Sequence, residues 1–239
     1  MANLDNNAMR SRAGVQDAAI DQGLRSYMLG VYNYMALGLA LTGIVAYLVA
    51  NTSLAYTIFS AQLHWVAMFA TLGLVFYLSF RIAKIKASTA QALFWVYAAL
   101  NGVWLSIIFL AYTDESIFRT FLVTAASFGA LSLYGYTTKR NLSAMGSFLF
   151  MGLIGLIIAS VVNLFLVSSA LQWAISVIGV LIFAGLTAFD TQKIKNIYYA
   201  VEGSAEAVAK TSVMGALALY LDFLNLFLFL LRFLGNSRS

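Results

Sequence analysis

The last apolar run of the chain decides the fold: residues 212–231 read SVMGALALYLDFLNLFLFLL. A helix rises about 1.5 Å per residue, so a run of this length covers the roughly 30 Å of hydrocarbon in a bilayer. The run contains one acidic residue, Asp222, near its middle, and no basic residue. It therefore predicts a transmembrane helix that carries a carboxyl group inside the membrane.

Six more apolar runs precede this one, in a chain of 239 residues that is 62% hydrophobic and 10% charged. A soluble domain carries about 25% charged residues. The seven runs are residues 27–50, 61–80, 90–112, 117–137, 143–168, 171–189 and 212–231. Each is long enough to span a bilayer, so the sequence predicts an all-α polytopic membrane protein. Residues 1–26 are expected to form a polar, mobile tail, and residues 27–239 a domain of seven transmembrane helices.

Basic residues indicate the orientation of these helices. Most of them lie in the tail and in the loops after the second, fourth and sixth runs, and only Arg119, Arg232 and Arg238 lie on the opposite side. Cytoplasmic loops carry an excess of Lys and Arg, so the N-terminus is predicted to be cytoplasmic and the C-terminus outside. Because the basic residues do not form a stripe, we expect no nucleic-acid partner.

Several chemistries lack the residues that they require. The chain has no cysteine, one histidine (His64) and no lysine inside any run. These facts argue against thiol chemistry, an intramembrane zinc hydrolase and a retinal Schiff base. His-Glu-x-x-His, Gly-x-Ser-x-Gly and phosphate-binding loop motifs are absent from the sequence. We therefore expect neither an enzyme nor a bound cofactor.

Two aspartates are the strongest candidates for function. Asp222 lies inside the seventh run, and Asp190 closes the sixth. A charge within the bilayer is costly and is usually paired or functional. Both residues belong to the inner halves of consecutive antiparallel helices, so they could face each other. Two carboxyls in one apolar site do not easily both ionise and would share a proton, which would make the pair a pH sensor. The alternative is structural: Asp222 bonded to a neighbouring helix, and Asp190 paired with Lys193 or Lys195.

Further polar residues lie near these two. Arg81, at the inner end of the second run, is on the correct side to form a bidentate bond with one carboxylate, or it is simply an anchor at the membrane surface. Asn101, Asn163 and Asn225 lie within runs. They are candidates to line a polar path or, alternatively, to join helices by hydrogen bonds.

Small residues recur four positions apart, which favours close approach of helix backbones. The pairs are Ala36 with Ala40, Ala125 with Gly129, and Ala126 with Ala130. We expect these faces to pack inside the bundle.

Four stretches carry a resemblance to a known family. Residues 190–194 (DTQKI) and 218–227 (ALYLDFLNLF) resemble the signature of the Bax inhibitor-1, or transmembrane Bax inhibitor motif, family. Residues 21–25 (DQGLR) and 133–139 (LYGYTTK) extend the resemblance across the chain. The plain polar tail makes the chain most similar to the bacterial branch.

This resemblance implies a seventh helix at the centre of the other six and a slow calcium leak through the bacterial inner membrane. It also implies that Asp190 and Asp222 form a pH-sensing pair and that Arg81 latches the first of them. Calcium prefers six to eight oxygen ligands, so two aspartates would hold it only weakly and transiently, which suits conduction. The alternatives are a regulatory partner of another membrane protein, such as a quality-control protease, and proton-coupled transport of a small solute. With the pore inside one chain, we expect a monomer.

Overall fold

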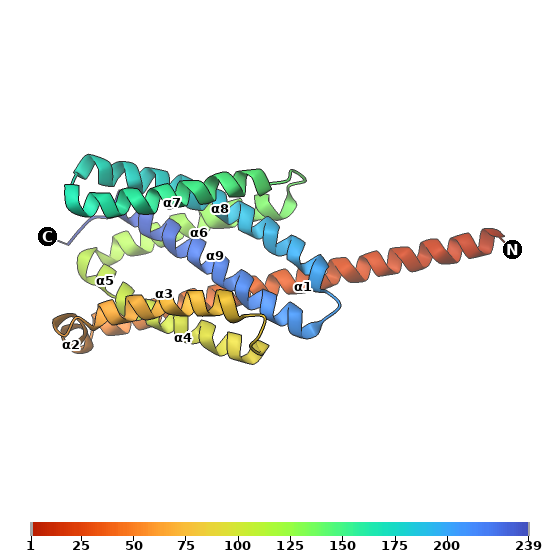
Figure 1. The fold of residues 1–239 in the computed structure, drawn as a ribbon, viewed down its shortest axis with the longest axis horizontal. Helices are drawn as coiled ribbons and strands as arrows, with labels where there is room; N and C mark the ends of the chain where they lie inside the picture. The colour runs from red at the N-terminus through yellow and green to blue at the C-terminus, as the bar shows by residue number, and fades with distance from the viewer. Residues whose placement is uncertain (1, 239) are drawn as a thin grey trace.

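The structure, a computed structural model, describes residues 2–238, and their side chains from residue 20 onward. This part of the chain is α-helical, and its only β-type pairing is an isolated bridge between Tyr112 and Ser237 (Figure 1). The helices are α1 Ala2–Ala50, α2 Leu54–Ser60, α3 Leu63–Arg81, α4 Ala87–Leu105, α5 Ile107–Ala111, α6 Asp114–Thr137, α7 Ser143–Leu166, α8 Ser169–Val201 and α9 Ala205–Leu234.

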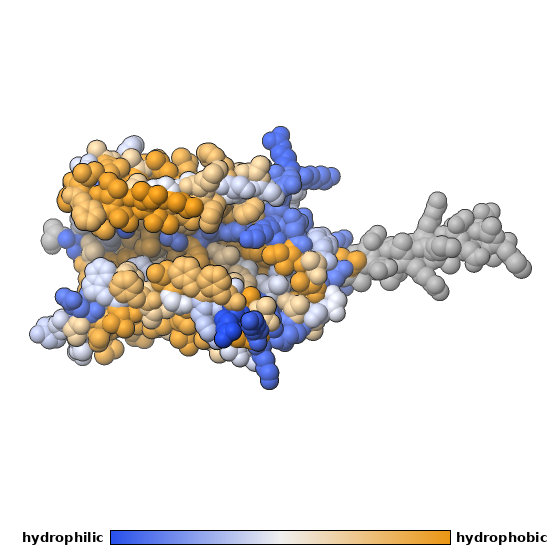
Figure 2. All heavy atoms as spheres, in the orientation of Figure 1, coloured by the Kyte–Doolittle hydropathy of each residue, from blue (hydrophilic) through white to orange (hydrophobic). Residues whose placement is uncertain are grey.

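Seven helical segments of the described part are long and apolar enough to cross a membrane. They are Ile20–Ala50, Leu63–Arg81, Ala87–Ala111, Asp114–Thr137, Ser143–Leu166, Ser169–Val201 and Ala205–Leu234. Figure 2 shows hydrophobic atoms over the sides of the bundle and hydrophilic atoms gathered toward its ends. Such apolar sides are stable in lipid rather than in water. The predicted all-α polytopic fold with seven spans is confirmed.

The last two spans are longer than their apolar runs. Helix α8 continues to Val201 and α9 begins at Ala205, so only residues 202–204 separate them. The extension of α8 is amphipathic: Ile194 and Tyr198 are buried on one face, whereas Lys193 is exposed. Because polar residues alternate with apolar ones in this extension, the continuous apolar run ends before the helix does. Ser204 starts α9 by accepting a hydrogen bond from the Ala207 amide.

Three other boundaries differ from the predicted ones. Helix α1 runs without a break through the segment expected to be a mobile tail, and Leu24 is already buried. The predicted loop 51–60 contains the short helix α2. The third span is interrupted at Ser106, whose hydroxyl donates to the Val103 carbonyl at 2.7 Å. Local bonds of this kind compete with the helical ladder and bend helices.

Helix α9 has the largest buried share of the seven spans. It packs against α1, α4, α6 and α8, whereas α3 packs on α4 and α7 packs on α8. Figure 1 shows α9 crossing between the α3–α4 pair and the α7–α8 pair. The last helix therefore has four principal neighbours in the described structure, with α3 and α7 farther out, instead of an even ring of six.

The closest backbone contacts involve glycines outside the predicted small-residue pairs. A Cβ atom on Gly135 of α6 would collide with the Ala188 carbonyl of α8, and one on Gly102 of α4 would collide with α1 at Thr42. By contrast, all six residues of the predicted pairs are exposed. The prediction that those pairs pack inside the bundle is wrong, because spacing alone does not tell which face of a helix meets another helix.

We predict that Gly135→Ala destabilises the protein by about 1–3 kcal/mol, because the added methyl group forces α6 away from the α8 backbone. Unfolding in detergent, followed by the loss of helical signal, measures the change. Gly129→Ala on the same helix is the matched control, because its Cβ would meet open space. Equal stability of the two variants would contradict the close α6–α8 contact.

Candidate functional site

Asp222 lies within α9 and its side chain faces the interior of the bundle, with 4% of the residue exposed. Its neighbours in sequence, Tyr220 and Phe223, are also buried. Within the described part of the chain, its Oδ2 atom is buried and has no hydrogen-bond partner. A buried polar atom without a partner costs roughly 1–3 kcal/mol, so such a position needs an explanation beyond packing.

Asp190 approaches Asp222 from α8. The side chains of these two residues lie close enough to form a hydrogen bond, which requires that one of the two carboxyl groups carries a proton, and Asp190 is half-buried. Helices α8 and α9 share the most extensive helix–helix contact of the bundle, which holds the two carboxyl groups together. The structure therefore brings together the two residues that the sequence singled out.

The positive charge beside this pair comes from Lys193. It lies one turn after Asp190 on α8, is exposed, and forms none of the ion pairs recorded among residues 2–238, so its charge acts on the two carboxyl groups only from a distance. Its Nζ also lies 5.9 Å from the centre of the Phe189 ring. Two carboxyl groups close together in an apolar site do not easily both ionise, so the site favours a single shared negative charge.

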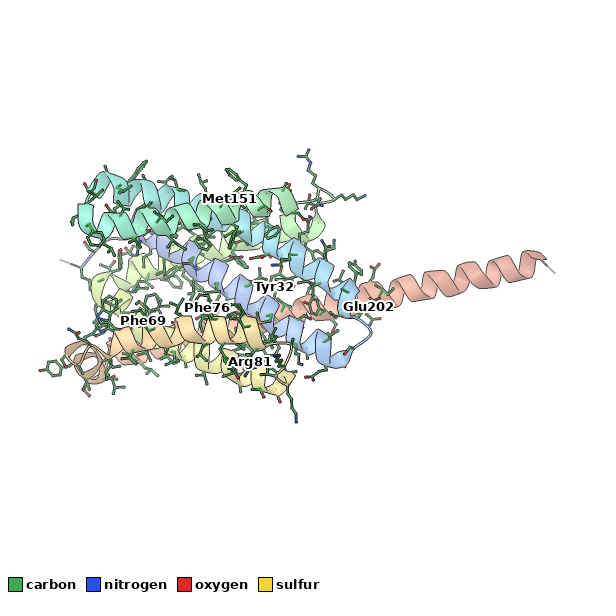
Figure 3. All side chains as sticks on the ribbon, in the orientation of Figure 1. Tyr32, Phe69, Phe76, Arg81, Met151 and Glu202 are labelled. Carbon is green, nitrogen blue, oxygen red and sulfur yellow. The ribbon has the colours of Figure 1, made fainter. Side chains whose placement is uncertain are left out.

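Arg81, the predicted latch, lies elsewhere in this structure. It ends α3, its side chain is exposed, and it takes part in none of the ion pairs recorded among residues 2–238. Figure 3 labels Arg81 at the end of α3, on the opposite side of the bundle from Met151 of α7. Helix α3 makes no extensive contact with α8. The predicted contact between Arg81 and Asp190 is thus not formed in this arrangement.

The three asparagines each have local partners. Asn101 is buried, donates to the Tyr97 carbonyl and accepts from the Trp104 indole. Asn225, one turn after Asp222, donates to the Leu221 carbonyl. Asn163 accepts from the Ser168 amide and so stabilises the turn between α7 and α8. Of the three, Asn225 lies nearest in sequence to the carboxyl pair.

A buried stripe of hydroxyl groups on α6 is absent from the sequence-based candidates. Its members are Ser116, Thr120, Thr124 and Ser132, all buried along one face of α6. On α8, Thr187 and Thr191 are buried as well. The Ser132 hydroxyl hydrogen-bonds Thr191 at 2.9 Å, next to Asp190. The four-residue spacing of Ser and Thr on α6 is the sequence pattern that could have identified this stripe.

These features define a class: a polytopic membrane protein of seven helices with an acidic pair between its last two spans. Residues 24–239 match the family described as "Inhibitor of apoptosis-promoting Bax1". The chain belongs to this Bax inhibitor-1 family, as its sequence signature indicates.

Curated relatives match nearly the whole chain. The chain is 53% identical to "Uncharacterized protein RP147" of Rickettsia prowazekii, over 94% of this chain and 95% of that one. It is 49% identical to "Inner membrane protein YbhL" of Escherichia coli, over 96% of this chain and 98% of that one. A membrane protein of Streptococcus pyogenes is 38% identical over 91% and 95% of the two chains.

We predict that Asp222→Asn stabilises the folded protein at neutral pH by roughly 1–3 kcal/mol, because the variant removes a carboxyl that is buried without full hydrogen bonding and lies beside another acid. Denaturant unfolding in detergent measures the difference. Asp114→Asn is the control, because Asp114 is exposed and its ion pair with Arg238 contributes little. A destabilised Asp222→Asn variant would show instead that the carboxyl group forms a hydrogen bond that stabilises the fold.

Proposed function

We propose that this protein is a pH-sensitive calcium leak channel of a bacterial inner membrane. The observation that carries the proposal is the buried carboxyl of Asp222, with an unpartnered oxygen, beside Asp190 of the adjacent span. The location follows the printed name of the relative YbhL, an inner membrane protein. The channel itself would need neither a catalytic centre nor a cofactor.

The proposed gate works through one proton. While the two carboxyls share a proton, they attract each other and hold α8 against α9. Loss of that proton leaves two negative charges in a site of low dielectric, where their repulsion is strong. The repulsion favours separation of the two helices or capture of a cation between them. Protonation thus couples to the packing of the last two spans.

Calcium would be cargo in this site rather than a resident ion. Calcium takes six to eight oxygen ligands. Among the described residues there is no group of three or more His, Cys, Asp or Glu side chains that could hold a metal. Asp190 and Asp222 would therefore bind calcium together with water and nearby amide or hydroxyl oxygens, such as those of Asn225. Such binding is weak enough for an ion to leave, as conduction requires.

We predict that the purified protein in liposomes passes calcium, that the rate depends on pH between about 5 and 8, and that Asp222→Asn flattens this dependence because no proton remains to be shared. Asp190→Asn should act in the same direction. A fluorescent calcium indicator inside the liposomes measures the flux. Glu115→Gln is the matched control, because Glu115 is exposed and pairs only with Arg119.

Wild-type liposomes that pass no more calcium than empty ones at any pH would overturn the leak function. The protein would then be better explained as a regulatory partner of another membrane protein, such as a quality-control protease. A pH-dependent leak that persists in both aspartate variants would support the channel function but show that the pair is not its pH sensor.

For Arg81 to act as a latch, it must approach Asp190 from α3 in another conformation. In this structure Lys193, one turn after Asp190 on the same helix, is the cation whose charge acts on both carboxyl groups, although none of the ion pairs recorded among residues 2–238 joins it to them. We therefore predict that Lys193→Gln changes the pH profile of the leak more than Arg81→Gln does, in the same liposome assay. The reverse order would support a state in which Arg81 replaces Lys193.

A further inference from the structure

A seam runs between α1 and α6 along the side of the bundle. Both helices pack on α9, yet they make no extensive contact with each other in the described structure. The Tyr32 hydroxyl of α1 bridges the seam by a hydrogen bond to the Ser132 hydroxyl of α6. Figure 3 labels Tyr32 in the middle of the view, on α1 near α9. The two spans therefore leave space between them.

The space consists of two cavities. One, of about 280 Å³, lies toward the end of the bundle that carries Asp114, and Phe223, Leu224 and Phe227 of α9 are among its lining residues. The other, of about 500 Å³, lies toward the end that carries Arg25. This second volume falls within the range of about 300–1,000 Å³ typical of ligand sites. We call it the α1–α6 groove; its lining residues are Arg25, Met28, Leu29, Tyr32, Met35, Phe128, Gly129, Ser132, Leu133 and Tyr136.

The lining of the groove is mainly apolar, is crossed by the Tyr32–Ser132 hydrogen bond, and is cationic at one end. Arg25 is exposed and takes part in none of the ion pairs recorded among residues 2–238. Lys195 lies at the same end, where its Nζ donates to the Tyr136 carbonyl at 2.8 Å and lies 5.1 Å from the centre of the Tyr136 ring. The exposed acids Asp21 and Glu202 lie at the same end, so the case for an anionic headgroup rests on the position of Arg25 and not on the net charge of this mouth.

The length of the groove matches one leaflet. Its lining on α1 extends from Arg25 to Met35, which is roughly 15 Å along a helix and about half of the 30 Å hydrocarbon thickness. A lipid whose headgroup lies at the bundle end would therefore place its acyl chain beside Phe128 and Gly129. The apolar walls suit an acyl chain, and Arg25 suits a phosphate, which guanidinium groups bind with directed hydrogen bonds.

We propose that the α1–α6 groove is a binding site for one anionic phospholipid, with its phosphate at Arg25 and an acyl chain between α1 and α6. This site is separate from the carboxyl pair and does not depend on the calcium leak. It nevertheless lies against the same helix, because the Phe128 ring is 5.5 Å from the Phe223 ring, next to Asp222. Occupancy of the groove would support the packing of α6 on α9.

Native mass spectrometry of the detergent-solubilised protein tests the headgroup. With phosphatidylglycerol and phosphatidylcholine of equal acyl chains, we predict a preference of roughly fivefold for the anionic lipid, the scale of one basic side chain at a membrane surface. Arg25→Gln removes the preference and Arg25→Lys largely keeps it. Arg140→Gln is the matched control, because Arg140 is an exposed cation in the loop after α6. Equal binding of both lipids by wild type, or a preference that survives Arg25→Gln, overturns the proposal.

A second variant tests the acyl chain. A Cβ on Gly129 would meet open space, so Gly129→Phe fills the groove without a clash at the backbone. We predict that it lowers retention of both lipids several-fold. Gly155→Phe on α7 is the matched control, because its added side chain also enters open space, away from the groove. If the two variants retain lipid equally, the bound lipid is distributed around the whole bundle, and the α1–α6 groove is not a specific binding site.

Discussion

The contact between α8 and α9 places a buried carboxyl group in a bundle whose described residues include no other buried charged side chain. Only residues 202–204 connect the two helices, so they run antiparallel and Asp190 and Asp222 meet across their interface. Helices α1, α4 and α6 complete the burial of α9. The cost of holding Asp222 away from water is therefore distributed over the packing of five helices. If the proposed gate operates, a change in its protonation would affect all of them, because packed interiors adopt discrete arrangements and do not deform continuously.

Several other buried polar groups of the bundle have hydrogen-bond partners, many of them on their own helix. The Thr124, Thr187 and Thr191 hydroxyls each donate to a carbonyl one turn earlier on their own helix. The Tyr220 hydroxyl pairs with Thr42 of α1 at 2.6 Å. In a bilayer, where water does not reach the backbone, such satisfaction is required for stability. Three buried side-chain atoms of the described residues lack such a partner, on Tyr27, His64 and Asp222, and Asp222 is the only carboxyl group among them.

The outer helices show how the bilayer replaces a protein neighbour. Helix α7 has the smallest buried share of the seven spans, and α3 rests mainly on α4. The seam between α1 and α6 has a similar origin. Each of these helices packs on α9, so they do not need to contact each other. Lipid then fills what side chains leave open. In the α1–α6 groove, the cation Arg25 at one end would select a lipid with an anionic headgroup.

The sequence by itself determined that the chain is all-α, that it has seven spans, and that Asp190 and Asp222 are the acids needing explanation. Hydrophobic length and a lone charge are local properties, and the bilayer selects on them directly. Only the tertiary structure decided that α8 and α9 extend beyond their apolar runs, because their ends are buried on one face alone. It also decided that Gly102 and Gly135 make the close contacts, and that Arg81 lies exposed at the end of α3, away from the carboxyl pair. These outcomes depend on which faces of distant helices fit together, and residue spacing within one helix does not contain that information.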